Sequence, residues 1–258
     1  MNILISNDDG IHSLGLNALA TAAKEFGEVY VVAPHRERST AGHSLTLHKP
    51  LRIFEVDQNR YAATGTPADC IFLGVREVLK KKPDLILSGI NLGANLGTDV
   101  HYSGTVAAAR EGALMGVPSV AFSLVDHQAI SKFPKEPLDF ETGTHWAREV
   151  LSLVVGKSFP PRGLLNVNIP SLPAADVKGI RLARQGVRFY SNEISRRTDP
   201  RGKDYFWIGG AYEGFEANPM SDCHGLDQGY VTVTPLNIDA THEAFMGELR
   251  ESFVLLKE

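Results

Sequence analysis

Short apolar runs alternate with amphipathic segments along the first two thirds of the chain. A short, mostly apolar run at residues 2–6 is typical of a strand buried in a parallel sheet. Similar strand-like runs follow at residues 29–33, 84–88, 119–124 and 164–169. After the first run, apolar residues recur at helical spacing and predict a helix that Gly27 ends; they are Leu16, Leu19, Ala20, Ala23 and Phe26.

Further helices are predicted at residues 66–81, 105–115 and 142–155. The first of these opens with a capping threonine, Thr66, followed by proline at the first helical position and an acid in the first turn. Strands that alternate with helices at this spacing form βαβ units. The sequence therefore predicts an α/β fold with a mostly parallel sheet covered by helices on both faces.

The pattern changes near residue 178, after which strand-like segments follow one another without helices between them. Residues 184–214 read as two strands around a turn, and we expect a projecting hairpin arm rich in aromatic residues: Phe189, Tyr190, Tyr205, Phe206 and Trp207. Either a partner covers these rings or the hairpin folds back onto its own core. We expect one domain over residues 1–258, with a core over 1–178 and a C-terminal strand and helix within 228–258.

Composition narrows the class of protein. The chain has 258 residues, 43% of them hydrophobic and 22% charged, which is typical of a globular domain. Lysine and arginine number 26 against 30 acidic residues, and this acidic balance argues against an electrostatic nucleic-acid partner. We find neither a membrane-length apolar run nor a basic leader, and we expect a cytoplasmic protein with no membrane partner. The two cysteines, Cys70 and Cys223, match no metal or redox spacing.

Polar residues follow three of the predicted strands at their carboxyl ends, where open parallel sheets bind ligands. Asp8 and Asp9 follow the first strand, Ser39 lies in the loop after the second, and Asn91 and Asn95 lie in the glycine-punctuated loop 89–97. Carboxylate, hydroxyl and amide oxygens suit magnesium, manganese or calcium and not zinc. If the three strands are neighbours, these residues share one cation site. The alternative is that one acid caps the next helix while the other faces water.

A segment that suits phosphate follows the same loop. Ser103, Gly104 and Thr105 open a predicted helix, whose free amides and dipole favour an anion. The alternative is a simple helix cap. The sequence lacks a P-loop, a dinucleotide fingerprint after the first strand, a nucleophile elbow and a His-Glu-x-x-His zinc motif.

The motifs taken together resemble the SurE family, the stationary-phase survival proteins that act as nucleotidases. They occur in one order and span almost the whole chain: Ser6-Asn-Asp-Asp-Gly-Ile11, Arg38-Ser39, Gly65-Thr-Pro-Ala-Asp-Cys70, Ser88-Gly-Ile-Asn91, Asn95-Leu-Gly97, Tyr102-Ser-Gly-Thr105, Asn166-Val-Asn-Ile-Pro170, Asp199-Pro-Arg-Gly202 and Gly229-Tyr-Val-Thr-Val-Thr-Pro-Leu236. Departures from the family pattern occur at residues 12–15 and at Ser221.

The resemblance implies a Rossmann-like core, a projecting hairpin and an exchanged C-terminal region used in oligomerisation, with assembly as a homodimer or homotetramer. It also implies a divalent-metal-dependent phosphomonoesterase that hydrolyses nucleoside 5′- and 3′-monophosphates and sometimes trims polyphosphate. Asp8, Asp9, Ser39 and Asn91 match the family's metal ligands, and its phosphate contacts match Asn95, Ser103, Gly104 and Thr105. We expect one metal ion per subunit, magnesium or manganese, with cobalt or calcium as alternative occupants.

From these residues we expect Asp8 and Asp9 to be catalytic, through a metal ion that polarises the phosphoryl oxygens and activates a water for in-line attack. The amides near Ser103–Thr105 would stabilise the charge that develops on the phosphoryl oxygens. An aspartate acting as base or nucleophile stays open at this point. The rival hypothesis is a metal-dependent nucleotide-binding or signalling protein that does not turn its ligand over.

Overall fold

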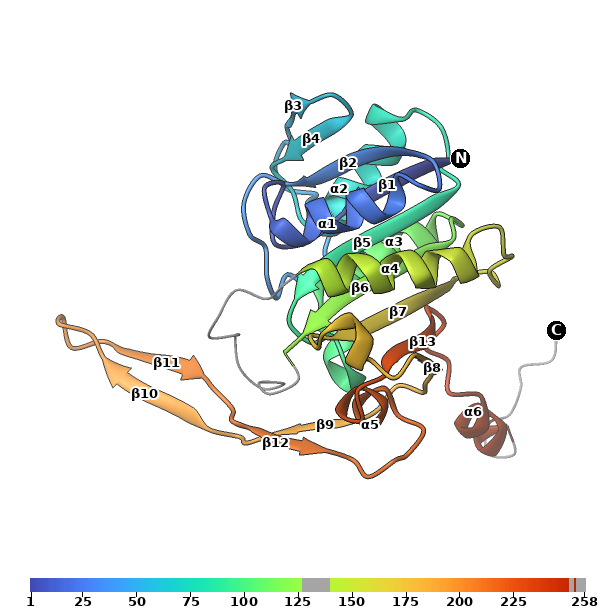
Figure 1. Cartoon of the computed structure of the whole chain (residues 1–258). Coiled ribbons are helices and arrows are strands. Elements are labelled where there is room, and N and C mark those ends of the chain that lie inside the picture. The colour runs from blue at the N-terminus through green and yellow to red at the C-terminus, as the bar shows by residue number, and fades with distance from the viewer. Residues whose placement is uncertain (127–139, 251–252, 254–258) are drawn as a thin grey trace.

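A computed structural model describes residues 1–126, 140–250 and 253 of the chain. In this part of the chain, nine strands form one central sheet, in the order β3-β4-β2-β1-β5-β6-β7-β13-β8 (Figure 1). The strands are β1 (Asn2–Ser6), β2 (Glu28–Pro34), β3 (Ile53–Asp57), β4 (Arg60–Ala63), β5 (Leu85–Leu92), β6 (Ser119–Val125), β7 (Gly163–Pro170), β8 (Ile180–Leu182) and β13 (Val231–Asn237). Six of them, from β4 through β7, run parallel; β3 and β13 pair antiparallel to β4 and β7.

The chain order reverses at β1. The first crossover leads from β1 to β2 on one side, whereas β5 pairs with the other side of β1. Such a reversal leaves a crevice at the carboxyl ends of the two strands. The sheet therefore brings the segment after β1 beside the segment at the end of β5.

Helices cover both faces of the sheet, as the alternating pattern predicted. On one face lie α1 (Leu14–Ala23) and α4 (Phe140–Val154), which pack against each other (Figure 1). On the other lie α2 (Pro67–Leu73) and α3 (Gly104–Leu114). The result is a three-layer Rossmann-like α/β fold, and the predicted fold class is confirmed.

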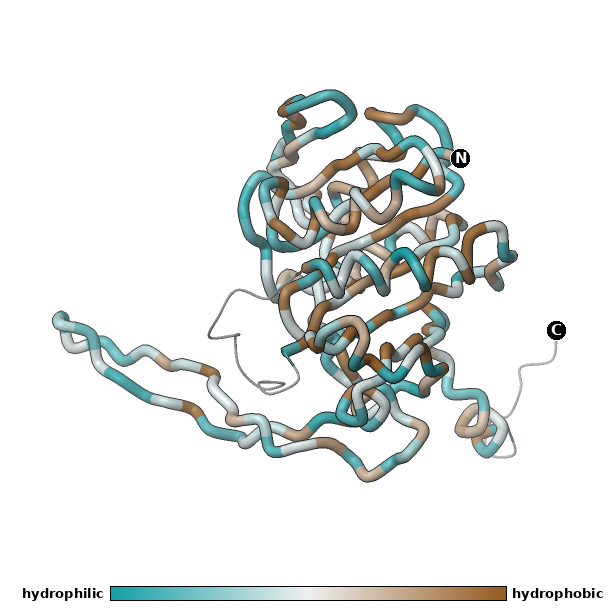
Figure 2. Tube along the Cα trace, in the orientation of Figure 1, coloured by the Kyte–Doolittle hydropathy of each residue, from teal (hydrophilic) through white to brown (hydrophobic). Residues whose placement is uncertain are grey.

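The mostly apolar run of β1 has a structural cause. Side chains along a strand alternate between the two faces of the sheet, so Ile3 and Ile5 join the core under α1 and α4, while Leu4 joins the core under α2 and α3. All three are fully buried. Figure 2 shows the resulting hydrophobic centre and the more hydrophilic loops around it. A strand covered on both faces is mostly apolar along its length.

The hairpin arm projects from the core, as expected (Figure 1). At its base β9 (Arg188–Tyr190) pairs with β12 (Tyr212–Phe215), and at its tip β10 (Ile194–Thr198) pairs with β11 (Asp204–Ile208). The rings of Phe206 and Trp207 are 58% and 64% exposed. The alternative in which the hairpin folds back onto its own core is therefore excluded.

Two predicted boundaries were wrong. The strand expected to end at residue 88 continues to Leu92, because its backbone resumes pairing with β6 at Asn91 after a register shift. Gly89 therefore lies in a β-bulge and does not begin a loop. The helix expected to reach residue 81 ends earlier: α2 passes into one π-helical turn, η1 (Gly74–Val78), and the left-handed Lys80 then turns the chain away.

The C-terminal third holds one helix that the periodicity did not predict, α5 (Asp222–Asp227), which is too short to show a repeat; the hydroxyl of Ser221 caps it. The terminal helix, predicted over residues 243–256, is present as α6 (Glu243–Leu249); residues 251–252 and 254–258 lie outside the described residues. The short turns η2 (Gly97–His101) and η3 (Ala174–Asp176) complete the elements. Among the described residues, no helix is both long and apolar enough to cross a membrane.

Candidate functional site

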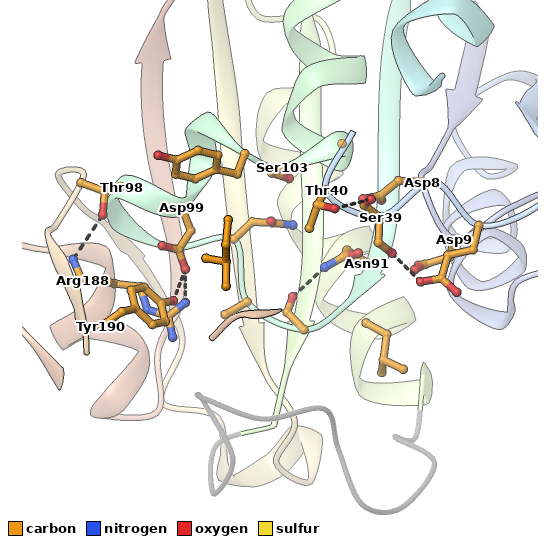
Figure 3. Close-up of a pocket in the computed structure, with 18 residues that line it drawn as sticks. Asp8, Asp9, Ser39, Thr40, Asn91, Thr98, Asp99, Ser103, Arg188 and Tyr190 are labelled. Atoms are coloured by element: carbon orange, nitrogen blue, oxygen red, sulfur yellow. Dashed lines mark hydrogen bonds and ion pairs between the residues drawn. The ribbon is translucent and has the colours of Figure 1, made fainter. Parts of the chain in front are cut away.

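A cavity of about 1180 Å³ opens at the carboxyl ends of β1 and β5. It extends from the loop after β1, past the end of β5 and the start of α3, to the base of the arm (Figure 3). Seven of the eight residues predicted from the sequence line it: Asp8, Asp9, Ser39, Asn91, Asn95, Ser103 and Gly104. The sheet thus brings together residues nearly one hundred positions apart.

Asp8 is fixed by contacts from two other parts of the chain. Its side chain is buried against the start of α3, where the Thr105 hydroxyl donates a 2.5 Å hydrogen bond to Asp8 Oδ1. Its carbonyl accepts a hydrogen bond from the backbone N–H of Arg38. Burial raises the pKa of the Asp8 carboxyl, and the hydrogen bonds from Thr105 offset part of that rise.

Asp9 lies beside it, also largely buried. Burial raises the pKa of Asp9 to about 7, and the negative charge of Asp8 adds to the rise. The preceding Asn7 holds the turn in place, because its amide nitrogen donates to the Gly10 carbonyl and its amide oxygen accepts the Gly10 N–H. Two adjacent carboxyl groups are therefore held rigidly in an environment that disfavours their charge.

The neighbouring oxygens come from two other elements. Ser39 lies in the loop after β2, and its hydroxyl donates a 2.5 Å hydrogen bond to Glu37 Oε1. Asn91 lies near the end of β5, and its amide nitrogen donates to the Gly93 carbonyl at 2.9 Å (Figure 3). Each contact uses the hydrogen of the group, so the Ser39 and Asn91 oxygens stay available as acceptors or ligands.

These four residues fit a divalent cation. Within the described residues, no lysine, arginine or histidine side chain pairs with Asp8 or Asp9, although burial raises the cost of both charges. Two carboxylates, a hydroxyl and an amide oxygen are hard donors. The described residues contain no cluster of three or more histidine, cysteine or acidic side chains that could hold a metal. Because all four donors are oxygens, the set suits magnesium or manganese better than a softer ion.

The start of α3 forms the wall next to Asp8. Ser103 caps the helix, its oxygen accepting the N–H of Val106 at 3.0 Å, and its side chain lines the cavity. A methyl group on Gly104 would lie 2.8 Å from Asp8 Cβ, so only glycine permits this approach of helix and acid. Gly104 also lines the cavity.

Thr105 has a different place from the one expected. It is fully buried and does not line the cavity. Both its hydroxyl and its backbone N–H interact with the Asp8 carboxylate. The Thr105 side chain therefore positions Asp8, because the short distance between α3 and β1 turns it under that acid. The phosphate contact expected of Thr105 stays a prediction.

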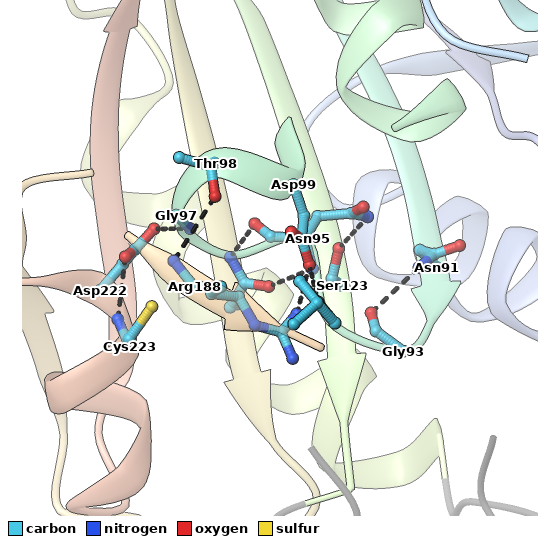
Figure 4. Close-up of polar contacts among 12 residues, drawn as sticks. Asn91, Gly93, Asn95, Gly97, Thr98, Asp99, Ser123, Arg188, Asp222 and Cys223 are labelled. Carbon is cyan, nitrogen blue, oxygen red and sulfur yellow. Dashed lines mark hydrogen bonds and ion pairs between the residues drawn. The ribbon is translucent and has the colours of Figure 1, made fainter. Parts of the chain in front are cut away.

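Asn95 is held by a buried polar network (Figure 4). Its carbonyl accepts hydrogen bonds from the side-chain amides of Asn166 and Asn168, at 2.7 and 3.0 Å. Its own amide nitrogen donates to the Ser123 hydroxyl at 2.9 Å. These bonds fix the loop after β5 against β6 and β7. They also explain why asparagine occurs at both positions, 166 and 168, of the Asn166-to-Pro170 motif.

The cavity residues that the sequence reasoning did not predict as site residues include Glu37, Asp99, Arg188 and Tyr190. Glu37 lies two residues before Ser39. The loop holds several charged residues, and nothing in the sequence indicates which of them faces the cavity. Arg188 and Tyr190 come from the base of the arm, and Asp99 comes from η2. No short-range spacing connects residues 99 and 188, so no sequence signal pointed to this group.

Comparisons with known proteins identify the family of the chain. The family model described as Survival protein SurE matches residues 3–192. The chain belongs to the SurE family. The match covers most of the chain and includes every predicted site residue. The resemblance drawn from the motifs is thereby confirmed.

Relatives extend the match to almost the full length. The chain is 46% identical over 246 residues to the 5′-nucleotidase SurE of Pelobacter propionicus, covering 95% of this chain and 97% of the relative. It is 43% identical to the 5′-nucleotidase SurE of Vibrio cholerae, covering 95% and 94%. The crystal structure of the SurE protein from Aquifex aeolicus superposes with a TM-score of 0.84 at 42% identity, covering 98% of this chain and 99% of that one.

Proposed function

We propose that this chain is a 5′-nucleotidase, which hydrolyses nucleoside 5′-monophosphates to nucleoside and phosphate. The observation that carries the proposal is one cavity lined by the adjacent carboxyl groups of Asp8 and Asp9, in which the buried Asp8 contacts the start of α3. Oxygen donors for a cation thus lie next to a helix terminus that favours an anion. The names of the relatives in Pelobacter propionicus and Vibrio cholerae support the same substrate class.

Asp8, Asp9, Ser39 and Asn91 would hold one divalent ion, magnesium or manganese. When bound, such an ion supplies Lewis-acid polarisation of the phosphoryl oxygens and lowers the pKa of a coordinated water. The cation would also offset the burial cost of the two carboxylates, with which no lysine, arginine or histidine of the described part of the chain pairs.

The residues of the chain itself bind and orient the phosphate. Ser103 and the backbone of Gly104 lie at the positive end of the α3 dipole, where they favour the charge that develops during transfer. Asn95 lines the same wall. The Asn95 amide nitrogen already donates a hydrogen bond to the Ser123 hydroxyl. The amide oxygen would accept a hydrogen bond from a water or a protonated phosphate.

Hydrolysis of 3′-monophosphates and trimming of short polyphosphate are further parts of the proposal. The cavity extends well beyond the oxygen donors and is open to solvent, so it does not enclose a single ester geometry. Both activities use the same phosphoryl site with a different leaving group.

The proposal is tested by phosphate release from 5′- and 3′-mononucleotides and short polyphosphate, with magnesium, with manganese and with a chelator. We expect catalytic release from the mononucleotides that stops on chelation and returns when the metal is restored. Saturable mononucleotide binding without release under any metal would instead favour the rival class, a nucleotide-binding protein that does not turn over.

We also propose that the chain forms a homodimer or homotetramer through its arm and C-terminal region. The arm exposes Ile194, Phe206, Trp207 and Ile208, an apolar surface that a partner subunit would cover. Deleting the tip strands β10 and β11 should lower the mass in solution, measured by light scattering. An unchanged mass would show that the arm is not the interface.

A further inference from the structure

The cavity has a second end that the phosphate chemistry does not use. Opposite the oxygen donors, Asp99, Arg188 and Tyr190 point toward one another from η2 and β9 (Figure 3). Arg188 Nη1 lies 2.5 Å from Asp99 Oδ2, and the Tyr190 hydroxyl donates to the same oxygen at 2.5 Å. We call these three residues the distal cluster.

The two ends differ in charge. Asp8, Asp9 and Glu37 make the first end acidic, which suits a cation and the phosphate that a cation attracts. In the distal cluster, the Arg188 guanidinium is paired with the Asp99 carboxylate, so the formal charges cancel. A neutral, partly aromatic surface does not attract a second phosphate; it suits the uncharged part of a substrate.

The distal cluster is rigid before any ligand arrives. The Arg188 side chain is only 3% exposed, and its guanidinium stacks 4.5 Å from the centre of the Tyr212 ring. Asp222, at the start of α5, ties the two backbone segments together, since its carboxylate accepts the N–H of Gly97 and of Gly186, each at 2.9 Å (Figure 4). Such a preformed surface orders a ligand at little entropic cost.

The cluster also leaves groups that match a nucleoside. Both side-chain hydrogen bonds of Asp99 end on Oδ2, so Oδ1 can accept a donor such as a ribose hydroxyl. Tyr102, three residues after Asp99, also lines the cavity and is 73% exposed. Its ring offers a face on which a base can stack. Asp99 and Ser103 belong to one continuous segment, so the distal cluster is directly connected to the phosphate wall.

We infer that the distal cluster is the nucleoside-binding end of the cavity, where Asp99 accepts a hydrogen bond from a ribose hydroxyl and Tyr102 stacks against the base. This inference rests on the proposed nucleotidase function. It assigns substrate selection to Asp99 and Tyr102, and it assigns to Arg188 and Tyr190 the role of holding Asp99 in place.

The test compares three substrates: a ribonucleoside 5′-monophosphate, its 2′,3′-dideoxy analogue and phenyl phosphate, which has no nucleoside. Asp99→Asn should lower kcat/KM for the ribonucleotide by about tenfold or more, the scale of a hydrogen bond to a charged group. The same change should alter kcat/KM for the dideoxynucleotide and for phenyl phosphate by less than about twofold, because neither reaches Asp99 with a hydroxyl.

Tyr102→Ala separates stacking from hydrogen bonding. It should raise KM for both nucleotides by more than for phenyl phosphate, whose single small ring offers less area for stacking. Tyr102 is exposed, so its removal should leave the fold intact. Phe54→Ala, at an exposed aromatic on β3 that does not line the cavity, is the matched control and should change nothing.

The possible failures are distinct. If the unmodified protein releases phosphate from no substrate, the proposed function fails. If it releases phosphate but Asp99→Asn and Tyr102→Ala affect all three substrates equally, or none, the nucleoside assignment is overturned while the nucleotidase function stands.

Discussion

Replacement of Asp8 by asparagine is expected to lower kcat/KM for a nucleoside 5′-monophosphate by at least about a thousandfold, since a lost metal ligand removes several kcal/mol of transition-state stabilisation. Asparagine keeps the shape of the side chain and can accept the Thr105 hydrogen bond through its amide oxygen. What it removes is the negative charge that a divalent ion requires.

The same replacement should leave the fold intact. Burial raises the pKa of Asp8, so a charged carboxylate at this position lowers the stability of the folded protein when no metal is bound. The neutral amide avoids that cost, and the variant without metal should unfold at an equal or higher temperature than the unmodified protein. Thermal unfolding with a chelator present measures this directly.

The control for Asp8→Asn is Asp57→Asn, which makes the same chemical change at an exposed acid at the end of β3. It should leave both activity and metal affinity unchanged. Calorimetric titration with manganese should show loss of binding for Asp8→Asn alone. Near-normal turnover by Asp8→Asn would contradict the assignment of this residue to the metal and to catalysis.

Replacement of Gly104 by alanine is expected to lower kcat by about a hundredfold, the effect of displacing a catalytic group by about 1 Å. The new methyl group would lie 2.8 Å from both Cβ and Oδ2 of Asp8, closer than carbon atoms approach without a shift. Gly104 has no positive φ and opens a helix, where alanine is otherwise favourable. The added methyl group meets Asp8 first, so we expect the loss to come from displacing Asp8, and metal affinity should fall together with kcat.

The matched control is Gly247→Ala in α6, where an added methyl group meets nothing within 4 Å. Both variants change a helical glycine in the same way, but only Gly104 faces the site. Steady-state kinetics and metal titration of the two variants measure the effect. Full activity of Gly104→Ala would show that α3 and Asp8 can separate without consequence.

The local periodicity of the sequence predicted the elements that build the site. Strands buried on both faces are mostly apolar along their length, and this property made β1, β2, β5, β6 and β7 recognisable. Boundaries were less predictable where a glycine served a bulge: Gly89 looked like the start of a loop, yet β5 resumes pairing with β6 at Asn91. The choice between turn and bulge depends on a neighbouring strand, which no local pattern contains.

The sequence by itself determined the α/β fold, the family, and the placing of Asp8, Asp9, Ser39 and Asn91 at strand ends that face one edge of the sheet. These properties follow from short-range spacing and from motifs in a fixed order. They required only the rule that parallel strands present their carboxyl ends together.

Tertiary structure alone decided how those residues are used. It turned Thr105 under Asp8 across 97 positions of the chain, and it joined Asp99 to Arg188 across 89. It also left the aromatic arm exposed instead of folded back. Such pairings depend on how closely two packed elements approach, as the small Gly104 permits at Asp8, and that distance is a property of the assembled core.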